Sequence, residues 1–191
     1  CPALPGLTFD DPAEAAKVFS GVIFDVYQWQ QTMFDGSTQT FERLKRPNTA
    51  QVIAVVGDKI LVQDEEQPDG LGAFPSIPGG RCDPGEEPLT SAKRELAEET
   101  GYVSDDWMLW QETDPVGKIE WTVYTFIARQ CRKETEPHLD AGERITSRLI
   151  TFDEFIMLAD DPHFYSPELV STLLRLRLDS AAKEDFKRML F

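Results

Sequence analysis

Histidine and cysteine are scarce in this chain of 191 residues. It has two histidines, His138 and His163, and three cysteines, Cys1, Cys82 and Cys131. The cysteines show neither CxxC spacing nor an even count, so the pattern indicates neither a zinc site nor a disulfide framework. Two histidines also leave little material for a mechanism that pairs histidine with serine or cysteine. We therefore expect a reducing, cytoplasmic environment.

Long apolar runs and an excess of basic residues are also missing. No apolar run reaches the roughly 18 residues of a membrane span, and no secretory signal pattern opens the chain, so we expect a soluble protein without a membrane partner. The first residue is Cys1 and not Met, which suggests trimming. With 19 basic and 34 acidic residues the net charge is −15, which argues against nucleic acid as a partner. The chain has no GxxxxGK[ST] phosphate loop.

Acidic residues are abundant, and the densest pattern runs from Gly80 to Tyr102 as GRCDPGEEPLTSAKRELAEETGY. If residues 89–100 form a helix, Glu95, Glu98 and Glu99 project from neighbouring positions on one face. Like charges at this spacing repel each other, so helix propensity does not explain them. A bound Mg2+ or Mn2+ does, because both cations take oxygen ligands. The alternative is a solvated acidic helix face, which requires no glycines or arginine at fixed offsets.

The spacing of the fixed residues in this region resembles the complete Nudix box. The matching positions are Gly80, Glu86, Arg94, Glu95, Leu96, Glu98, Glu99, Gly101 and the large apolar Tyr102. The resemblance implies an α/β fold, the Nudix α/β/α sandwich with a mixed β-sheet. It also implies a metal-dependent hydrolase.

The resemblance further assigns roles to individual residues. Glu95, Glu98 and Glu99 would hold one to three Mg2+ or Mn2+ ions, together with the backbone carbonyl of Gly79. These ions reverse the local sign of the field, so that a small polyanion binds to an acidic protein. Two further residues would support the carboxylates: Arg94 would orient them and Glu86 would fix the preceding loop.

The general base is open between a box glutamate such as Glu95 and a residue of a later loop. The segment 139–145, LDAGERI, resembles the acidic loop of members similar to ADP-ribose pyrophosphatase. Glu143 is the candidate base in that loop, where it would approach the metals and the attacking water. The alternative is that the segment only leads into a strand.

The implied substrate is a nucleoside diphosphate linked to another moiety, such as ADP-ribose or a sugar nucleotide, cleaved at its pyrophosphate bond. Residues 64–68, DEEQP, depart from the ADP-ribose branch, which commonly carries an arginine there. Alternatives are a pyrophosphatase that sanitises nucleoside triphosphates or oxidised nucleotides, and a Nudix module that senses a nucleotide without turnover. A calcium-buffering protein would lack turnover as well, and no EF-hand spacing supports it.

The remaining sequence predicts two regions. Residues 1–49 would form an N-terminal arm, including a helical turn within 11–19, and a β-hairpin extension of alternating aromatic and β-branched residues over 22–45. This hairpin resembles the element through which ADP-ribose-type members pair subunits, which implies a homodimer. Residues 50–191 would form the Nudix hydrolase domain. Its expected elements are a buried hairpin at 50–63, strands at 107–113, 120–129 and 145–151, and helices at 152–159 and 167–190.

Overall fold

The computed structural model describes residue 12 and residues 14–68, 72–139 and 141–191. Most of the predicted N-terminal arm therefore lies outside the described residues, as does Asp140 of the acidic loop. Within the described residues the chain forms three sheets and four α-helices.

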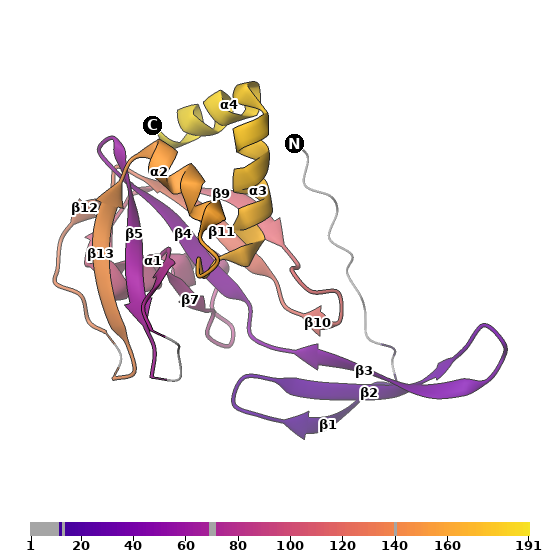
Figure 1. The fold of residues 1–191 in the computed structure, drawn as a ribbon. Coiled ribbons are helices and arrows are strands. Elements are labelled where there is room, and N and C mark those ends of the chain that lie inside the picture. Colours follow the sequence, from indigo (N-terminus) through magenta and orange to yellow (C-terminus); the bar gives the residue numbers. More distant parts are fainter. Residues whose placement is uncertain (1–11, 13, 69–71, 140) are drawn as a thin grey trace.

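A mixed sheet forms the centre of the molecule (Figure 1). Its main path runs β13-β5-β4-β11-β9, with β6 paired to β5 and β7 paired to β4. The parallel pair is β11 with β4, and the other pairs are antiparallel. The strands are β4 (Thr49–Val56), β5 (Lys59–Glu66), β6 (Phe74–Ser76), β7 (Gly79–Arg81), β9 (Asp106–Thr113), β11 (Val123–Arg129) and β13 (Arg144–Ile150). The strand expected over 120–129 thus begins only at Val123.

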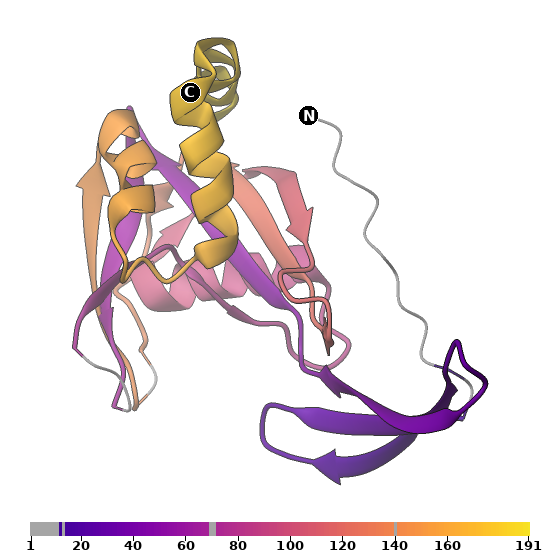
Figure 2. The ribbon, with the colours of Figure 1, turned by 45° about the vertical axis from the view of Figure 1, so that its right-hand side comes forward.

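Helices cover both faces of this sheet (Figures 1 and 2). One face carries α1 (Pro88–Thr100), and the other carries α2 (Phe152–Met157), the 3-10 turn η1 (Leu158–Asp160), α3 (Pro167–Leu178) and α4 (Ser180–Leu190). Because side chains alternate along a strand, β4 serves two cores. Val52 and Ala54 pack on the α1 side with Leu96, whereas Ile53 and Val55 belong to the core below the other helices. The α/β/α sandwich predicted from the sequence is confirmed.

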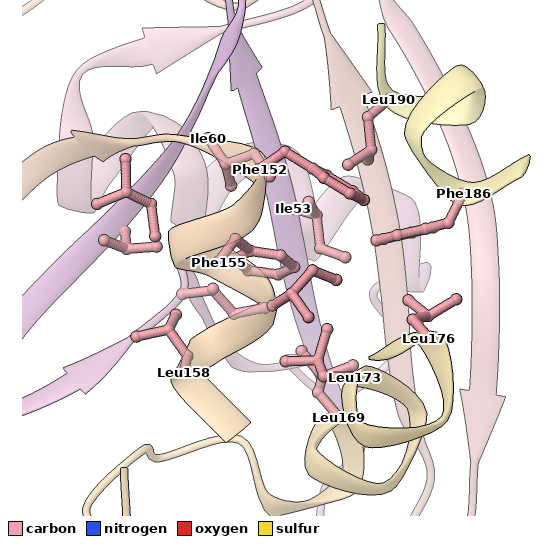
Figure 3. Packing of buried hydrophobic residues seen from close by; sticks show 14 of the residues in the cluster. Ile53, Ile60, Phe152, Phe155, Leu158, Leu169, Leu173, Leu176, Phe186 and Leu190 are labelled. Carbon is pink, nitrogen blue, oxygen red and sulfur yellow. The ribbon is translucent and has the colours of Figure 1, made fainter. Parts of the chain in front are cut away.

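The C-terminal segment forms two helices, and the single helix expected over 167–190 is wrong. The chain turns at Asp179, which has extended backbone angles of φ −118° and ψ 100°. Its side chain accepts a hydrogen bond of 3.0 Å from the N–H of Ala182 and so caps α4. The turn lets Phe186 and Leu190 of α4 join Leu173 of α3 in one core (Figure 3).

A separate sheet at the N-terminal end extends away from the central sheet (Figure 2). Its order is β1-β2-β3-β10, formed by β1 (Ala16–Ser20), β2 (Asp25–Thr32), β3 (Thr38–Lys45) and β10 (Ile119–Glu120). The predicted hairpin is confirmed, with a turn in which Gly36 has φ 84°. The helical turn expected up to Phe19 is wrong over 16–19, because β1 adds a third strand there.

A short third sheet pairs β8 (Tyr102–Val103) with β12 (Arg132–Lys133) beside the end of α1. No described helix combines the length and the apolar character that crossing a membrane requires.

Candidate active site

The ends of α1 are defined by local sequence. Pro88 lies in its first turn, where a missing N–H costs no hydrogen bond. The helix ends at Gly101, whose φ of 73° is left-handed and favours glycine. The carbonyl of Gly101 accepts hydrogen bonds from the N–H groups of Glu134 (2.9 Å) and Thr135 (3.2 Å). The chain that follows β12 is thereby held against the end of α1, on its way to the acidic loop.

Arg94 links the carboxylates of the box. Its Nη1 donates to Glu95 at 2.8 Å and to Glu98 at 3.1 Å. On its other edge, Nε and Nη2 donate to the two oxygens of Glu86 at 3.2 and 3.0 Å, so that this pair is bidentate. The hydrogen bonds to Arg94 hold the pKa of Glu86 below its ordinary value. Glu86 also accepts from the N–H of Asp83 at 3.1 Å, which fixes the turn before α1.

Glu99 is the buried carboxylate of the site, with 7% of its surface exposed. Its Oε2 accepts hydrogen bonds from Nε2 of Gln63 at 2.9 Å and from the N–H of Gly79 at 3.1 Å. Burial nevertheless raises the pKa of Glu99 to about 8, and the charge of Glu95 adds to the rise. Across the described residues no ion pair to Glu99 is present. Burying a carboxylate without a cation is costly, so this position favours a bound cation.

Glu95 lies between α1 and β7. Its side chain is 14% exposed, and burial raises its pKa. A Cβ atom at Gly80 would overlap the carboxylate of Glu95, so any larger residue there would displace that carboxylate. Gly79 is equally constrained on its other side, where a Cβ atom would lie 2.6 Å from the carbonyl oxygen of Ala50. The two glycines of β7 therefore allow close approach to β4 on one side and to the Glu95 carboxylate on the other.

Glu143 belongs to the same acidic region. Its negative charge contributes to the raised pKa of Glu95, which places the two carboxylates within electrostatic range of each other. The structure thus brings the box residues into contact with one another, whereas for Glu143 it gives the effect of its charge on the pKa of Glu95. Hydrogen bonds or ion pairs join Glu86, Arg94, Glu95 and Glu98 in one set and Gly79 and Glu99 in another, and electrostatic coupling joins Glu95 to Glu99 and to Glu143.

The donor set fits a hard divalent cation. Carboxylate oxygens are the ligands that Mg2+ and Mn2+ prefer, and α1 carries three such groups, one of which is the buried Glu99. In the described part of the chain, no three acidic, histidine or cysteine side chains lie together as a group that could hold a metal ion. The guanidinium of Arg94 pairs with Glu95 and Glu98 and supplies positive charge to these two carboxylates.

Sequence reasoning missed Gln63 and Ser76. Both are buried, with exposures of 1% and 3%, and Oγ of Ser76 donates to Oε1 of Gln63 at 3.3 Å. For Gln63 the sequence does offer a signal. It lies two positions after the apolar Leu61, so strand alternation places it on the same, core-facing side of β5.

The segment that departs from the ADP-ribose branch faces arginines of the next strand. In β13, Arg148 pairs with Asp64 at 2.9 Å and Arg144 with Glu66 at 3.5 Å. These are exposed ion pairs that join β5 to β13 beside Glu143. Basic side chains are therefore present at this edge of the site, although β5 itself is acidic there.

Known proteins resemble most of the chain. The curated methanol dehydrogenase activator of Bacillus methanolicus is 28% identical over 171 residues, which cover 87% of this chain and 92% of that protein. ADP-ribose pyrophosphatase of Bacillus subtilis is 27% identical over 169 residues, which cover 86% of this chain and 91% of that protein. A crystal structure of an ADP compounds hydrolase has the same fold, with a TM-score of 0.71, 20% identity and coverage of 86% of this chain and 90% of that one. The family model described as the NUDIX domain matches residues 45–170, a range that contains the complete box and the acidic loop, and the chain therefore belongs to the Nudix family.

Proposed function

We propose that this chain is a metal-dependent pyrophosphohydrolase that cleaves the pyrophosphate bond of a nucleoside diphosphate linked to another moiety. The observation that carries the proposal is the set of box carboxylates around the buried Glu99, which has hydrogen-bond donors but no cationic partner among the described residues. A binding module without turnover would not need this set intact. The named function of one homologue, an ADP-ribose pyrophosphatase, supports the same reaction class.

In this proposal Glu95, Glu98, Glu99 and the carbonyl of Gly79 would hold Mg2+ or Mn2+. Such an ion neutralises charge on phosphoryl oxygens and lowers the pKa of a bound water. Arg94 keeps the carboxylates of Glu95 and Glu98 on one side of α1. Through its pair with Arg94, Glu86 holds the preceding turn against the helix.

Glu143 is the proposed general base. It comes from the loop before β13, whereas the other carboxylates come from α1, so a substrate phosphate would lie between the two elements. A base in this loop would take the proton of the attacking water as one phosphate leaves. The rival base is Glu95, whose raised pKa also suits proton transfer.

Arg46 supports a substrate with an anionic or planar aromatic part. It lies three residues before β4, whose Thr49 pairs with Arg81 at the end of β7. Nε of Arg46 is buried without a hydrogen-bond partner, and the guanidinium lies 4.4 Å from the ring centroid of Trp121. A buried donor of this kind normally has a partner, and a ligand phosphate or base would provide one.

The decisive experiment is hydrolysis of a substrate panel by the wild-type chain and by Glu99→Gln, with Mg2+ or Mn2+. The panel contains ADP-ribose, sugar nucleotides, dinucleoside polyphosphates, NADH and oxidised nucleoside triphosphates. We expect turnover of a nucleoside diphosphate derivative, and loss of most turnover in Glu99→Gln with its fold retained. Turnover of triphosphates alone would favour the sanitising alternative. Binding of a nucleotide without hydrolysis by the wild-type chain would favour the sensor.

Two organisational proposals accompany this function. We infer that residues 1–49 act as an extension with an assembly role, while residues 50–191 carry the chemistry. We also infer a cytoplasmic location, which is supported by the free, buried thiols of Cys82 and Cys131.

A further inference from the structure

A buried hydrogen-bonded relay connects the central sheet to Glu99. Ser76 of β6 and Gln63 of β5 are directly paired residues of neighbouring antiparallel strands. Ser76 donates to Gln63 at 3.3 Å, and Gln63 donates to Glu99 at 2.9 Å. All three side chains are buried. Three separate elements, β6, β5 and α1, thus meet through one side-chain amide.

The relay fixes which end of the amide faces Glu99. An ionised carboxylate accepts hydrogen bonds and donates none. With a cation bound, Glu99 would be ionised, and the amide then presents its NH2 group to Glu99 while its Oε1 accepts from the hydroxyl of Ser76. Both bonds run in the same direction, from Ser76 through Gln63 to the carboxylate.

Both donors to Glu99 reach the same oxygen. The amide of Gln63 and the backbone N–H of Gly79 bind Oε2, and Oε1 of Glu99 has no hydrogen bond among the described residues. We infer that Gln63 is a positioning residue that fixes the rotation of the Glu99 carboxylate and leaves Oε1 for a divalent cation. This inference rests on the proposed metal-dependent function. It adds to the site a residue outside the box that determines metal affinity.

The chain contains a matched control for this role in Gln51 of β4. Gln51 is also buried, at 5% exposure. Its Nε2 donates to Thr125 at 2.8 Å and its Oε1 accepts from Ser166 at 3.3 Å. By strand alternation its side chain lies on the opposite face of the sheet, toward α3. Loss of either glutamine side chain removes similar buried hydrogen bonds, but only the side chain of Gln63 donates a hydrogen bond to a proposed metal ligand. Gln51 pairs with Gly79 through the strands, and Gln51→Leu leaves that backbone pairing in place.

The test is a titration of the protein alone with Mn2+, in which electron paramagnetic resonance measures the free Mn2+. Melting temperatures of the same variants are measured as well. Loss of an outer partner of a metal ligand typically weakens metal affinity by roughly 10- to 100-fold. We expect Gln63→Leu to weaken Mn2+ binding by that factor and Gln51→Leu to leave it near wild type. Both variants should melt at lower temperature, because each loses buried hydrogen bonds.

A second variant tests whether Glu99 is the ligand that Gln63 positions. The exchange Gln63→Glu with Glu99→Gln keeps an amide and a carboxylate in contact but moves the charge away from the helix. It should melt closer to wild type than Gln63→Leu does, yet bind Mn2+ as weakly. Wild-type Mn2+ affinity in Gln63→Leu would overturn the role of Gln63 while leaving the proposed function intact, as would equal losses in Gln63→Leu and Gln51→Leu. Wild-type affinity in the exchange variant would overturn Glu99 as a metal ligand, and with it both the role of Gln63 and the proposed metal site. A wild-type chain that binds no Mn2+ would overturn both.

Discussion

The ionisation of Glu99 couples the fold to the cation. Burial raises the pKa of this carboxyl from its ordinary value of 4.5 to about 8 in the folded chain. The folded state therefore holds a proton that the unfolded state releases between these two values. Stability from this group is fully present below pH 4.5 and is lost as the pH rises through about 8. A bound cation would remove this penalty, because it favours the charged carboxylate.

We predict that the metal-free chain loses stability between about pH 5 and 8, by an amount on the order of a few kcal/mol. Glu99→Gln should lose much less over the same window, since its amide does not titrate. Chemical denaturation at several pH values in the presence of a chelator measures the effect. Saturating Mn2+ should flatten the wild-type curve. Parallel pH curves for the wild type and Glu99→Gln without metal would contradict the assignment of the shift to Glu99.

Individual site residues differ in how well sequence predicts them. Glu95, Glu98 and Glu99 were identified because three carboxylates on one helix face repel each other and so need a cation. Gln63 was missed, because a glutamine at the end of an apolar run gives no indication of which distant group its amide meets. Glu99 lies 36 positions away from it. Only the packing of α1 on β5 brings the two together.

The approach of β7 to α1 depends on Gly80. We predict that Gly80→Ala displaces the carboxylate of Glu95, because the added Cβ atom would overlap it. The carboxylate is the far end of a flexible side chain, so stability should fall by less than the roughly 1–3 kcal/mol of core overpacking. Mn2+ affinity should fall, because a proposed ligand is displaced. Melting temperature and Mn2+ titration check the prediction.

Gly117→Ala is the control for this substitution. A Cβ atom at Gly117 would meet nothing within 4 Å, so the variant should match wild type in both measurements. If Gly80→Ala behaves like Gly117→Ala, the close approach of β7 to Glu95 is not a requirement of the site.

If Glu143 is the base, the loop before β13 supplies the proton acceptor and α1 supplies the metal ligands. We predict that Glu143→Gln lowers turnover by roughly 10²- to 10⁴-fold with little change in substrate affinity. Glu95→Gln, as a ligand variant, should also weaken metal affinity, so high Mg2+ should recover part of its loss. Rates measured across a Mg2+ titration separate the two. Near-normal turnover in Glu143→Gln would return the base role to the box.

The predicted bounds of an element agree with the structure where the sequence carries a clear start or stop residue. The helix expected over 89–100 is α1, which spans Pro88–Thr100 and ends at Gly101. The break at Asp179 was missed because apolar residues continue on both sides of it, although Asp followed by Ser is a helix-capping signal. The strand β1 was missed because all five of its residues are exposed, so no buried face gives it a period of two.

The N-terminal sheet differs from the rest of the chain in charge. Residues 16–46 contain four basic and three acidic side chains, whereas the whole chain has a net charge of −15. The same sheet exposes apolar side chains, and Phe19 and Val22 are 58% and 95% exposed. Two acidic bodies repel each other, so this nearly neutral, apolar sheet is the surface on which two copies of the chain would meet at the lowest electrostatic cost.

We predict that the chain is a homodimer that pairs through this sheet. An exposed apolar surface of this kind normally marks an interface, and β3 continues through Arg46 into β4, so a partner on the sheet would lie beside the body of the molecule.

Light scattering at micromolar concentration should give twice the chain mass. The double variant Val18→Lys with Phe19→Lys places two charges on β1 and should give the monomer mass. Leu178→Lys at the end of α3, which is 90% exposed but outside the sheet, should leave the dimer intact. A monomer mass for the wild-type chain would exclude pairing, and a dimer that survives the charges on β1 would place the interface elsewhere.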